Sequence, residues 1–81
     1  MQAIITKYIP CTNTRGSRIQ AKCEAKTIYF SYDHSLNVEN NHIAAAKELI
    51  KKLDWGGEWV SGGTATGYVF VCTEYCEKFE V

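Results

Sequence analysis

One stretch of the chain, residues 38–53, has helical periodicity, and this constrains the fold more than any other feature. Its apolar side chains recur three and four positions apart, the spacing of one helix face: Ile43, Ala46, Leu49, Ile50 and Leu53. Ser35 or Asn37 is the predicted N-cap, because short polar side chains accept hydrogen bonds from the first backbone N–H groups. A chain with a single helix can cover only one face of a sheet, so the other face is expected to stay partly open.

Five further segments have the composition of β-strands, with β-branched and aromatic residues prominent. Three precede the helix and two follow it: 2–9, 17–23, 27–32, 58–61 and 68–72. Residues 68–72 are apolar on both faces, which predicts that this strand lies in the interior of the sheet. The glycine-rich residues 62–67 are expected to form a turn longer than a two-residue hairpin loop. For residues 73–81 an edge strand, a helical turn and a loose tail all remain open. We therefore predict one α+β domain over residues 1–81, with a mainly antiparallel sheet (βββ-α-ββ) and one helix packed on one face.

Strict alternation of apolar and polar residues in 17–23 predicts how the second and third strands pair. Apolar side chains of both strands should share the buried face, which gives three pairs across a four-residue connection: Cys23–Ile28, Ala21–Phe30 and Ile19–Tyr32. The same register places Arg18 opposite Asp33, where an ion pair would orient the guanidinium.

The charge balance narrows the function classes. The net charge is zero and 22% of the residues are charged, which argues against a disordered chain and against a general nucleic-acid coat, but allows a local basic patch. Aromatic residues make up 12% of the chain, more than one helix can cover. Some of them should therefore lie on an exposed binding face: Tyr8, Tyr29, Trp59 and Tyr68 are the candidates.

The N-terminal residues 1–7 are interpreted as strand and not as a signal peptide, since a basic leader and a long apolar stretch do not occur there. We therefore expect the cytoplasm of a bacterial host cell. In that compartment the four cysteines are expected as free thiols; a zinc site is the weaker reading, because the spacing offers no paired CxxC knuckle. No metal or other cofactor is predicted. The four are Cys11, Cys23, Cys72 and Cys76.

A polar, basic segment between the first two strands is the main candidate for binding. Two guanidinium groups three residues apart, with hydroxyl and amide side chains and a glycine beside them, suit an anion or an acidic partner surface. The alternative is a polar hairpin loop with solvated arginines. The candidate residues are Thr12, Asn13, Thr14, Arg15, Ser17 and Arg18.

A second group of candidates lies around the helix start: Tyr32, Asp33, His34 and His42. Asp33 is interpreted as the helix entry and the partner of Arg18; an acid–base pair with His34 is the alternative. His42 flanks the apolar stripe, where a boundary residue satisfied by local hydrogen bonds is expected. The alternative is that His42 and His34 both face the arginine loop, the segment that contains Arg15 and Arg18.

The chain resembles a family of small phage- and plasmid-encoded proteins with no assigned chemistry. The resemblance extends along nearly the whole chain, and the residues that carry it are 7–10, 12–19, 32–34, 41–42, 44–46 and 67–71; the cysteines fall outside the pattern. It implies an accessory role during invasion of a host, for example inhibition of a defence system such as a CRISPR effector.

These observations predict a non-enzymatic binding protein that inhibits a host defence protein or ribonucleoprotein complex and has no catalytic residues. Two alternatives stay open. One is a small nucleic-acid-binding module in which tyrosines stack bases and Arg15, Arg18 and Lys22 hold phosphates. The other is a minimal hydrolase or nuclease that uses His34, Asp33 and the arginines. A homodimer is expected slightly more than a monomer.

Overall fold

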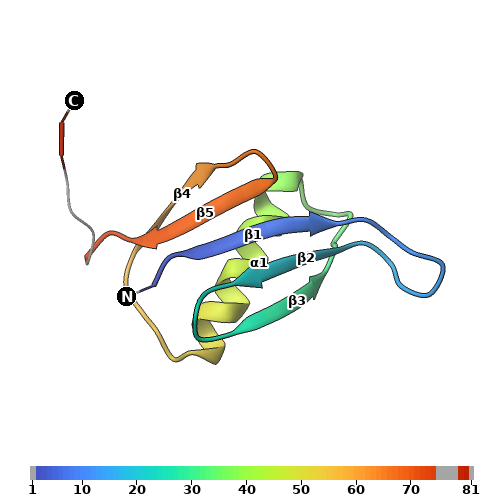
Figure 1. The fold of residues 1–81 in the computed structure, drawn as a ribbon, viewed down its shortest axis with the longest axis horizontal. Coiled ribbons are helices and arrows are strands. Elements are labelled where there is room, and N and C mark those ends of the chain that lie inside the picture. The colour runs from blue at the N-terminus through green and yellow to red at the C-terminus, as the bar shows by residue number, and fades with distance from the viewer. Residues whose placement is uncertain (1, 75–78, 81) are drawn as a thin grey trace.

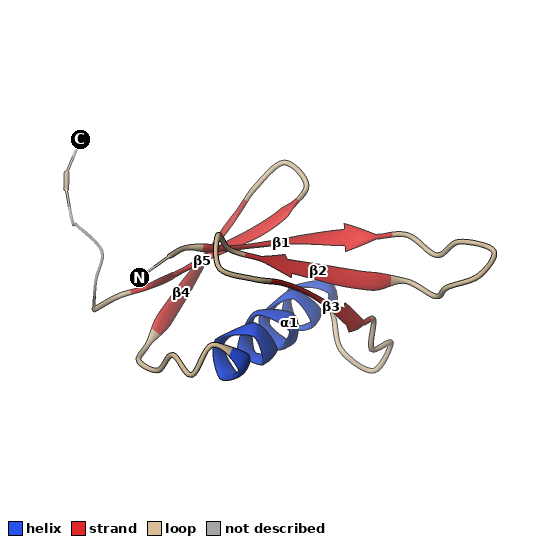
Figure 2. Ribbon diagram, turned by 60° about the horizontal axis from the view of Figure 1, so that its bottom comes forward, coloured by secondary structure: helices blue, strands red, loops and turns tan. Residues whose placement is uncertain are grey.

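The computed structural model describes residues 2–74 and 79–80 of the chain. Three strands, one helix and two further strands follow in order, as the sequence predicts: β1 (Ile4–Ile9), β2 (Arg18–Lys22), β3 (Thr27–Ser31), α1 (Val38–Lys52), β4 (Trp59–Gly63) and β5 (Gly67–Cys72). All strand pairs are antiparallel and the spatial order is β3-β2-β1-β5-β4. The sheet forms one layer and α1 a second layer beneath it (Figures 1 and 2). The α+β fold is thereby confirmed, including the interior place of β5.

The helix begins where short polar side chains can cap it. Asn37 is the N-cap, and its side chain accepts a hydrogen bond from the backbone N–H of Asn40. Lys51 and Lys52 in the last turn complement the negative end of the helix dipole. The helix has 15 residues, and among the described residues no helix is long and apolar enough to cross a membrane.

The core lies between α1 and the covered face of the sheet. It joins side chains from the helix, the three central strands and the end of β2: Ile4, Ile19, Ala21, Cys23, Ala45, Ala46, Leu49 and Phe70. Three polar residues are buried with them, Thr6, Asn41 and His42. The buried stripe of the helix therefore includes Asn41, His42 and Ala45, whereas Ile43 and Ile50, which were expected in it, are only half-buried.

The predicted register between the second and third strands is wrong by two residues. Ala21 pairs with Ile28 and Ile19 with Phe30, because the backbone N–H of Cys23 donates to the carbonyl of Lys26 and closes a shorter connection. A shift of two residues leaves every side chain on the same face, so the apolar pattern alone does not distinguish the two registers. Its consequence is local: Arg18 stands opposite Ser31 and not opposite Asp33.

The connection between β4 and β5 is also shorter than predicted. Gly63 pairs with Tyr68, and the backbone N–H of Thr64 donates to the carbonyl of Gly67. Only Ala65 and Thr66 remain as loop residues. The glycines that the sequence analysis assigned to a turn belong to the strand ends, and Gly67 is needed there because a Cβ at this position would collide with the carbonyl oxygen of Thr6.

Several strand ends differ by one or two positions from the prediction, as is usual where ladders fray. The thiols of Cys11, Cys23 and Cys72 are free, as expected, with Cys11 exposed and the other two buried. Cys76 and most of the predicted tail from 75 onward lie outside the described residues.

Candidate binding surface

The sheet face that α1 does not cover, called the open face below, is set by the strict alternation of the strands. Ile4 and Thr6 of β1 point to the helix and are fully buried, so their neighbours point the other way. The observed pairing extends this alternation to the neighbouring strands. On the three strands β1, β2 and β3 the open face carries Ile5, Lys7, Ile9, Arg18, Gln20, Lys22, Thr27, Tyr29 and Ser31.

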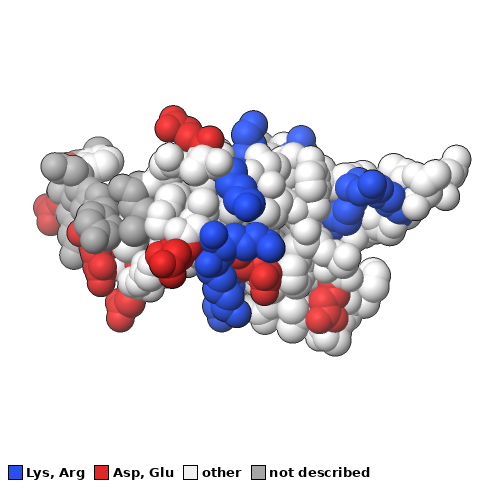
Figure 3. All heavy atoms as spheres, turned by 90° about the horizontal axis from the view of Figure 1, so that it is seen from below, with Lys and Arg blue, Asp and Glu red and all other residues white. Residues whose placement is uncertain are grey.

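All charged strand residues of the open face are cationic. Lys7 pairs with Gln20, so its ammonium group is flanked along β2 by Arg18 and Lys22. The described strand positions that face outward include no Asp or Glu. Figure 3 shows blue Lys and Arg groups at the upper edge of the molecule, beside a red acidic group, and again near the connection between β1 and β2, called the β1–β2 arm (residues 10–17); the largest blue group lies lower in this view. The strand positions of this face are thus positively charged in an electrically neutral chain, while Glu24, in the β2–β3 turn, lines a hollow together with Lys7 and Lys22.

Tyr29 and Arg18 form a stacked pair on this face. The guanidinium carbon of Arg18 lies 5.2 Å from the centroid of the Tyr29 ring, within the range of a cation–π interaction. Gln20 Nε2 donates a hydrogen bond of 3.1 Å to the Tyr29 hydroxyl, which fixes the ring from the other end. Tyr29 is nevertheless 54% exposed, so a large part of its surface is free to contact a partner.

Arg18 also connects the open face to a shallow hollow at the base of the β1–β2 arm. The arginine hollow, as it is called below, has a volume of about 410 Å³ and is lined by Arg15, Gly16, Ser17, Arg18, Ser31, Tyr32 and His34. The buried Nε of Arg18 has no hydrogen-bond partner among the described residues. The arrangement therefore offers two guanidiniums and two serine hydroxyls to an anion.

The tip of the arm is held by its own hydrogen bonds. Thr12 N donates to the carbonyl of Arg15 at 2.8 Å, and Thr12 Oγ1 accepts from the backbone N–H groups of Thr14 and Arg15. Thr12, Asn13 and Thr14 are exposed and do not line the arginine hollow. Of the six residues predicted in this segment, the structure brings only Arg15, Ser17 and Arg18 together in the hollow.

Tyr32 and His34 reach the same hollow from the end of β3. Their rings lie 5.1 Å apart, and Tyr32 packs edge-on against Tyr8 at 5.7 Å. Tyr8 in turn shares a hydrogen bond of 2.9 Å with Ser17. These contacts tie the arm to the body of the molecule through aromatic side chains.

Asp33 does not take the role predicted for it beside Arg18. Its carboxylate accepts hydrogen bonds from the backbone N–H and the hydroxyl of Ser35, at 2.9 and 2.6 Å, and these bonds hold the pKa of Asp33 below its usual value. The His34 ring packs on Tyr32, and its charge is the smallest of the effects on the pKa of Asp33; among the described residues no hydrogen bond joins the two side chains as an acid–base pair.

His42 lies inside the protein, away from the arginine hollow. It is 2% exposed, contacts Thr6 and packs against Tyr68 with ring centroids 4.7 Å apart. The prediction of a boundary residue, and the smaller chance that it faces the arginine loop, are therefore wrong. The hydrophobic pattern gave no sign of this burial, because a polar residue is placed inside only by specific hydrogen bonds.

Two features of this surface were missed by sequence reasoning. Lys7 was not assigned to the phosphate-binding set, because its place beside Gln20 depends on the pairing of β1 with β2. The packing of Arg18 on Tyr29 depends on the corrected register. The signal for Lys7 was nevertheless present, as a lone cation in an otherwise uncharged strand.

Within the described residues, no three His, Cys, Asp or Glu side chains are grouped so that they could hold a metal ion. Compared with known proteins, the chain matches no family model, no curated protein and no solved structure. The functional assignment therefore depends on the geometry above.

Proposed function

We propose that the protein is a non-enzymatic binding module whose open face binds single-stranded nucleic acid. The observation that carries this proposal is the combination of Lys7, Arg18 and Lys22 with the exposed ring of Tyr29 on one face, with no carboxylate at the described strand positions of that face. Recognition of a single strand needs two elements: cations that track the phosphate backbone of the nucleic acid, and an aromatic ring on which a base can stack.

The spacing of the cations suits an extended polyanion. Arg18 and Lys22 lie on the same side of β2 with Gln20 between them, and same-side neighbours in a strand are about 7 Å apart. Lys7 stands beside Gln20 on the adjacent strand. A chain of phosphates lying across β1 and β2 would meet all three, while Arg15 extends the positive surface toward the arm.

Stacking on Tyr29 is supported by its exposure and by the contacts that hold it. The ring is fixed by Gln20 at its hydroxyl and by Arg18 near its face. A ring that is already oriented loses little conformational entropy on binding. Exposed Ile5, 53% accessible on the same face, adds apolar surface against which an unstacked base can pack.

Binding of a labelled single-stranded oligonucleotide, measured by fluorescence anisotropy at low salt, tests the proposal. The variant Lys7→Glu/Lys22→Glu should weaken binding by about tenfold or more, since both phosphate contacts become repulsive. The matched control, Lys47→Glu/Lys52→Glu, makes the same charge change on α1, on the covered side of the sheet, and should retain most of the affinity. Equal losses in both variants, or no binding by the unmodified protein, would overturn the proposal.

A second candidate, the inhibitor of a host defence complex, is favoured by the projecting β1–β2 arm. The arm extends well beyond the sheet (Figure 1) and carries the arginine hollow at its base, where Tyr32 and His34 supply aromatic surface. A projecting loop with a cationic, aromatic base suits insertion into an acidic surface of a partner. We keep the bacterial cytoplasm as its expected location, because free thiols suit a reducing compartment.

The two candidates predict different responses to substitution. Co-purification with a host complex should be lost in Arg15→Glu/Arg18→Glu and kept in Lys7→Glu/Lys22→Glu if the arm makes the interface. If the variant with both arginines reversed still captures the complex, the arm is not the interface.

A further inference from the structure

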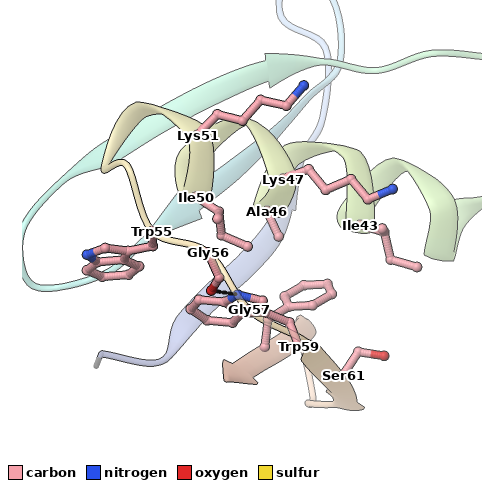
Figure 4. A pocket seen from close by; sticks show the side chains of 11 residues that line it. Ile43, Ala46, Lys47, Ile50, Lys51, Trp55, Gly56, Gly57, Trp59 and Ser61 are labelled. Carbon is pink, nitrogen blue, oxygen red and sulfur yellow. Dashed lines mark hydrogen bonds between the residues drawn. The ribbon is translucent and has the colours of Figure 1, made fainter. Parts of the chain in front are cut away.

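A second hollow lies on the opposite side of the molecule, between α1 and the strands β4 and β5. It has a volume of about 400 Å³, within the range of small-molecule sites. Its wall is mainly apolar: Ile43, Ala46, Ile50, Trp55, Trp59 and Phe70 line it. We call it the tryptophan groove; Figure 4 shows the helix on one side and Trp59 and Ser61 on the other.

The two tryptophans give this groove a fixed wall. Their rings are nearly parallel, 13° apart in plane with centroids separated by 6.0 Å. Trp59 Nε1 donates a hydrogen bond of 3.1 Å to the carbonyl of Gly56, which orients its ring. The indole N–H of Trp59 therefore already has a hydrogen-bond acceptor within the protein, so the contact that this residue offers to a ligand is the apolar surface of its ring.

Two lysines supply the polar rim on the helix side. Lys47 and Lys51 are one helical turn apart and line the groove, and in Figure 4 both side chains extend from α1 at the edge of the groove, away from Trp59. Their methylene stems can cover apolar surface while the ammonium groups stay in water. No carboxylate lines the groove among the described residues.

An acidic side chain adjoins the groove at the end formed by Gly57. A Cβ placed on Gly57 would come within 3.1 Å of the Glu74 carboxylate, so negative charge adjoins the Gly57 end, while positive charge occupies the helix rim. This separation orients an amphipathic ligand, since a negatively charged group is favoured beside Lys47 and Lys51 and disfavoured beside Glu74.

We propose that the tryptophan groove binds a small amphipathic organic anion, with its apolar body against Trp55, Trp59 and Phe70 and its anionic head at Lys47 and Lys51. The apolar lining supplies the binding energy through burial of the ligand's hydrocarbon. The lysines supply the preference for a negative head. This site is on the covered side of the sheet and does not depend on the function proposed for the open face.

Trp55 and Trp59 are the two tryptophans of the chain, so tryptophan emission reports directly on this groove. Titration with decanoate, decan-1-ol and decyltrimethylammonium, each below its micelle threshold, compares one hydrocarbon chain with three head groups. Decanoate should change the emission saturably and bind about tenfold more tightly than the alcohol, which corresponds to about 1.4 kcal/mol. The cationic probe should bind most weakly.

Two variants distinguish this site from non-specific adsorption. Lys47→Gln/Lys51→Gln should remove the preference for decanoate over decan-1-ol, whereas Lys26→Gln, in the β2–β3 turn, should keep it. Ser61→Phe places a large side chain in the groove from the exposed strand β4 and should block all three probes while circular dichroism shows an unchanged fold. The proposal is overturned if decanoate does not bind, if the three probes bind alike, or if the lysine variant retains the preference.

Discussion

Nδ1 of His42 lies 2.6 Å from Oγ1 of Thr6, and both residues are buried between the helix and the sheet. Thr6 Oγ1 also approaches the carbonyl of Tyr68 at 3.4 Å. The hydroxyl has one proton, so both contacts are hydrogen bonds when Nδ1 of His42 carries its hydrogen: the ring then donates to Oγ1, and Oγ1 donates to the Tyr68 carbonyl. The first turns of α1 are thus joined to β1 by a polar contact inside an apolar core.

The burial of His42 makes the stability of the protein dependent on pH. Burial lowers the pKa of His42 below its ordinary value of 6.5, because the imidazolium is disfavoured away from water. In the unfolded chain the ring takes up a proton at higher pH than in the folded protein. The free energy of unfolding should therefore be constant well above 6.5 and decrease as the pH falls below it.

Urea unfolding at a series of pH values checks this dependence. His42→Gln should flatten the profile near 6.5, even if the variant is less stable throughout. The pKa of Asp33 is lowered from 3.8, so the titration of this carboxyl changes the unfolding free energy at more acidic pH than the titration of His42 does. An unchanged slope in His42→Gln would contradict this account of the buried pair.

Asn41 is expected to stabilise the entry into the helix. Its Oδ1 accepts from Asp33 N at 2.7 Å, and its Nδ2 donates to the carbonyls of Asp33, Leu36 and Asn37. Asn41→Ala would remove the side-chain partner of the Asp33 N–H and of the Leu36 carbonyl, whereas the carbonyls of Asp33 and Asn37 keep backbone donors. The substitution should cost about 2 kcal/mol of unfolding free energy. The adjacent, exposed Asn40→Ala is the control and should cost much less; similar losses in the two would show that the buried hydrogen bonds contribute little.

Gly67 should tolerate no side chain. A Cβ there would collide with the Thr6 carbonyl, which belongs to the neighbouring central strand and cannot move aside easily, whereas the same addition at Gly63 meets nothing within 4 Å. Gly67→Ala should therefore lower the unfolding free energy by about 2 kcal/mol or more, and Gly63→Ala by far less. Equal thermal unfolding midpoints for the two variants would show that the β1–β5 contact adapts.

Tyr8 and Tyr29, both exposed, should differ in their effect on nucleic-acid binding. Tyr29 lies on the open face and Tyr8 in the row that faces the helix side, 54% and 44% exposed. Loss of one stacked base should weaken binding of a single strand by about 1–3 kcal/mol in Tyr29→Ala. Tyr8→Ala should bind nearly as the unmodified protein does, and the opposite ranking would place the bound strand elsewhere.

The sequence predicts the layers of this fold because periodicity decides which side of a strand or helix is apolar. The alternation from Arg18 to Lys22 and the interior character of β5 were interpreted correctly. The apolar pattern of the sequence does not determine the register of β2 with β3, since a slip of two residues keeps Ile19 and Ala21 on the covered face. Backbone hydrogen bonds in the turns, such as that of Cys23 with Lys26, decide between them.

The candidate surface was predictable only in part for the same reason. Arg18 and Lys22 alternate with apolar residues on one strand, so their common side follows from the sequence alone. Lys7 joins them through strand pairing, and the partner of Arg18 changes from Asp33 to Tyr29 once the register is known. His42 was placed wrongly because its burial depends on Thr6, a residue 36 positions away in the chain.

The salt dependence of single-strand binding tests the central claim most directly. If Lys7, Arg15, Arg18 and Lys22 each neutralise one phosphate, log K should fall with log salt concentration with a slope of about −2.8, and Lys22→Gln should reduce this slope by about 0.7. Lys47→Gln, on α1, should leave the slope unchanged. Binding that shows no salt dependence, or a slope that Lys22→Gln does not alter, would contradict the assignment of the open face as a nucleic-acid surface.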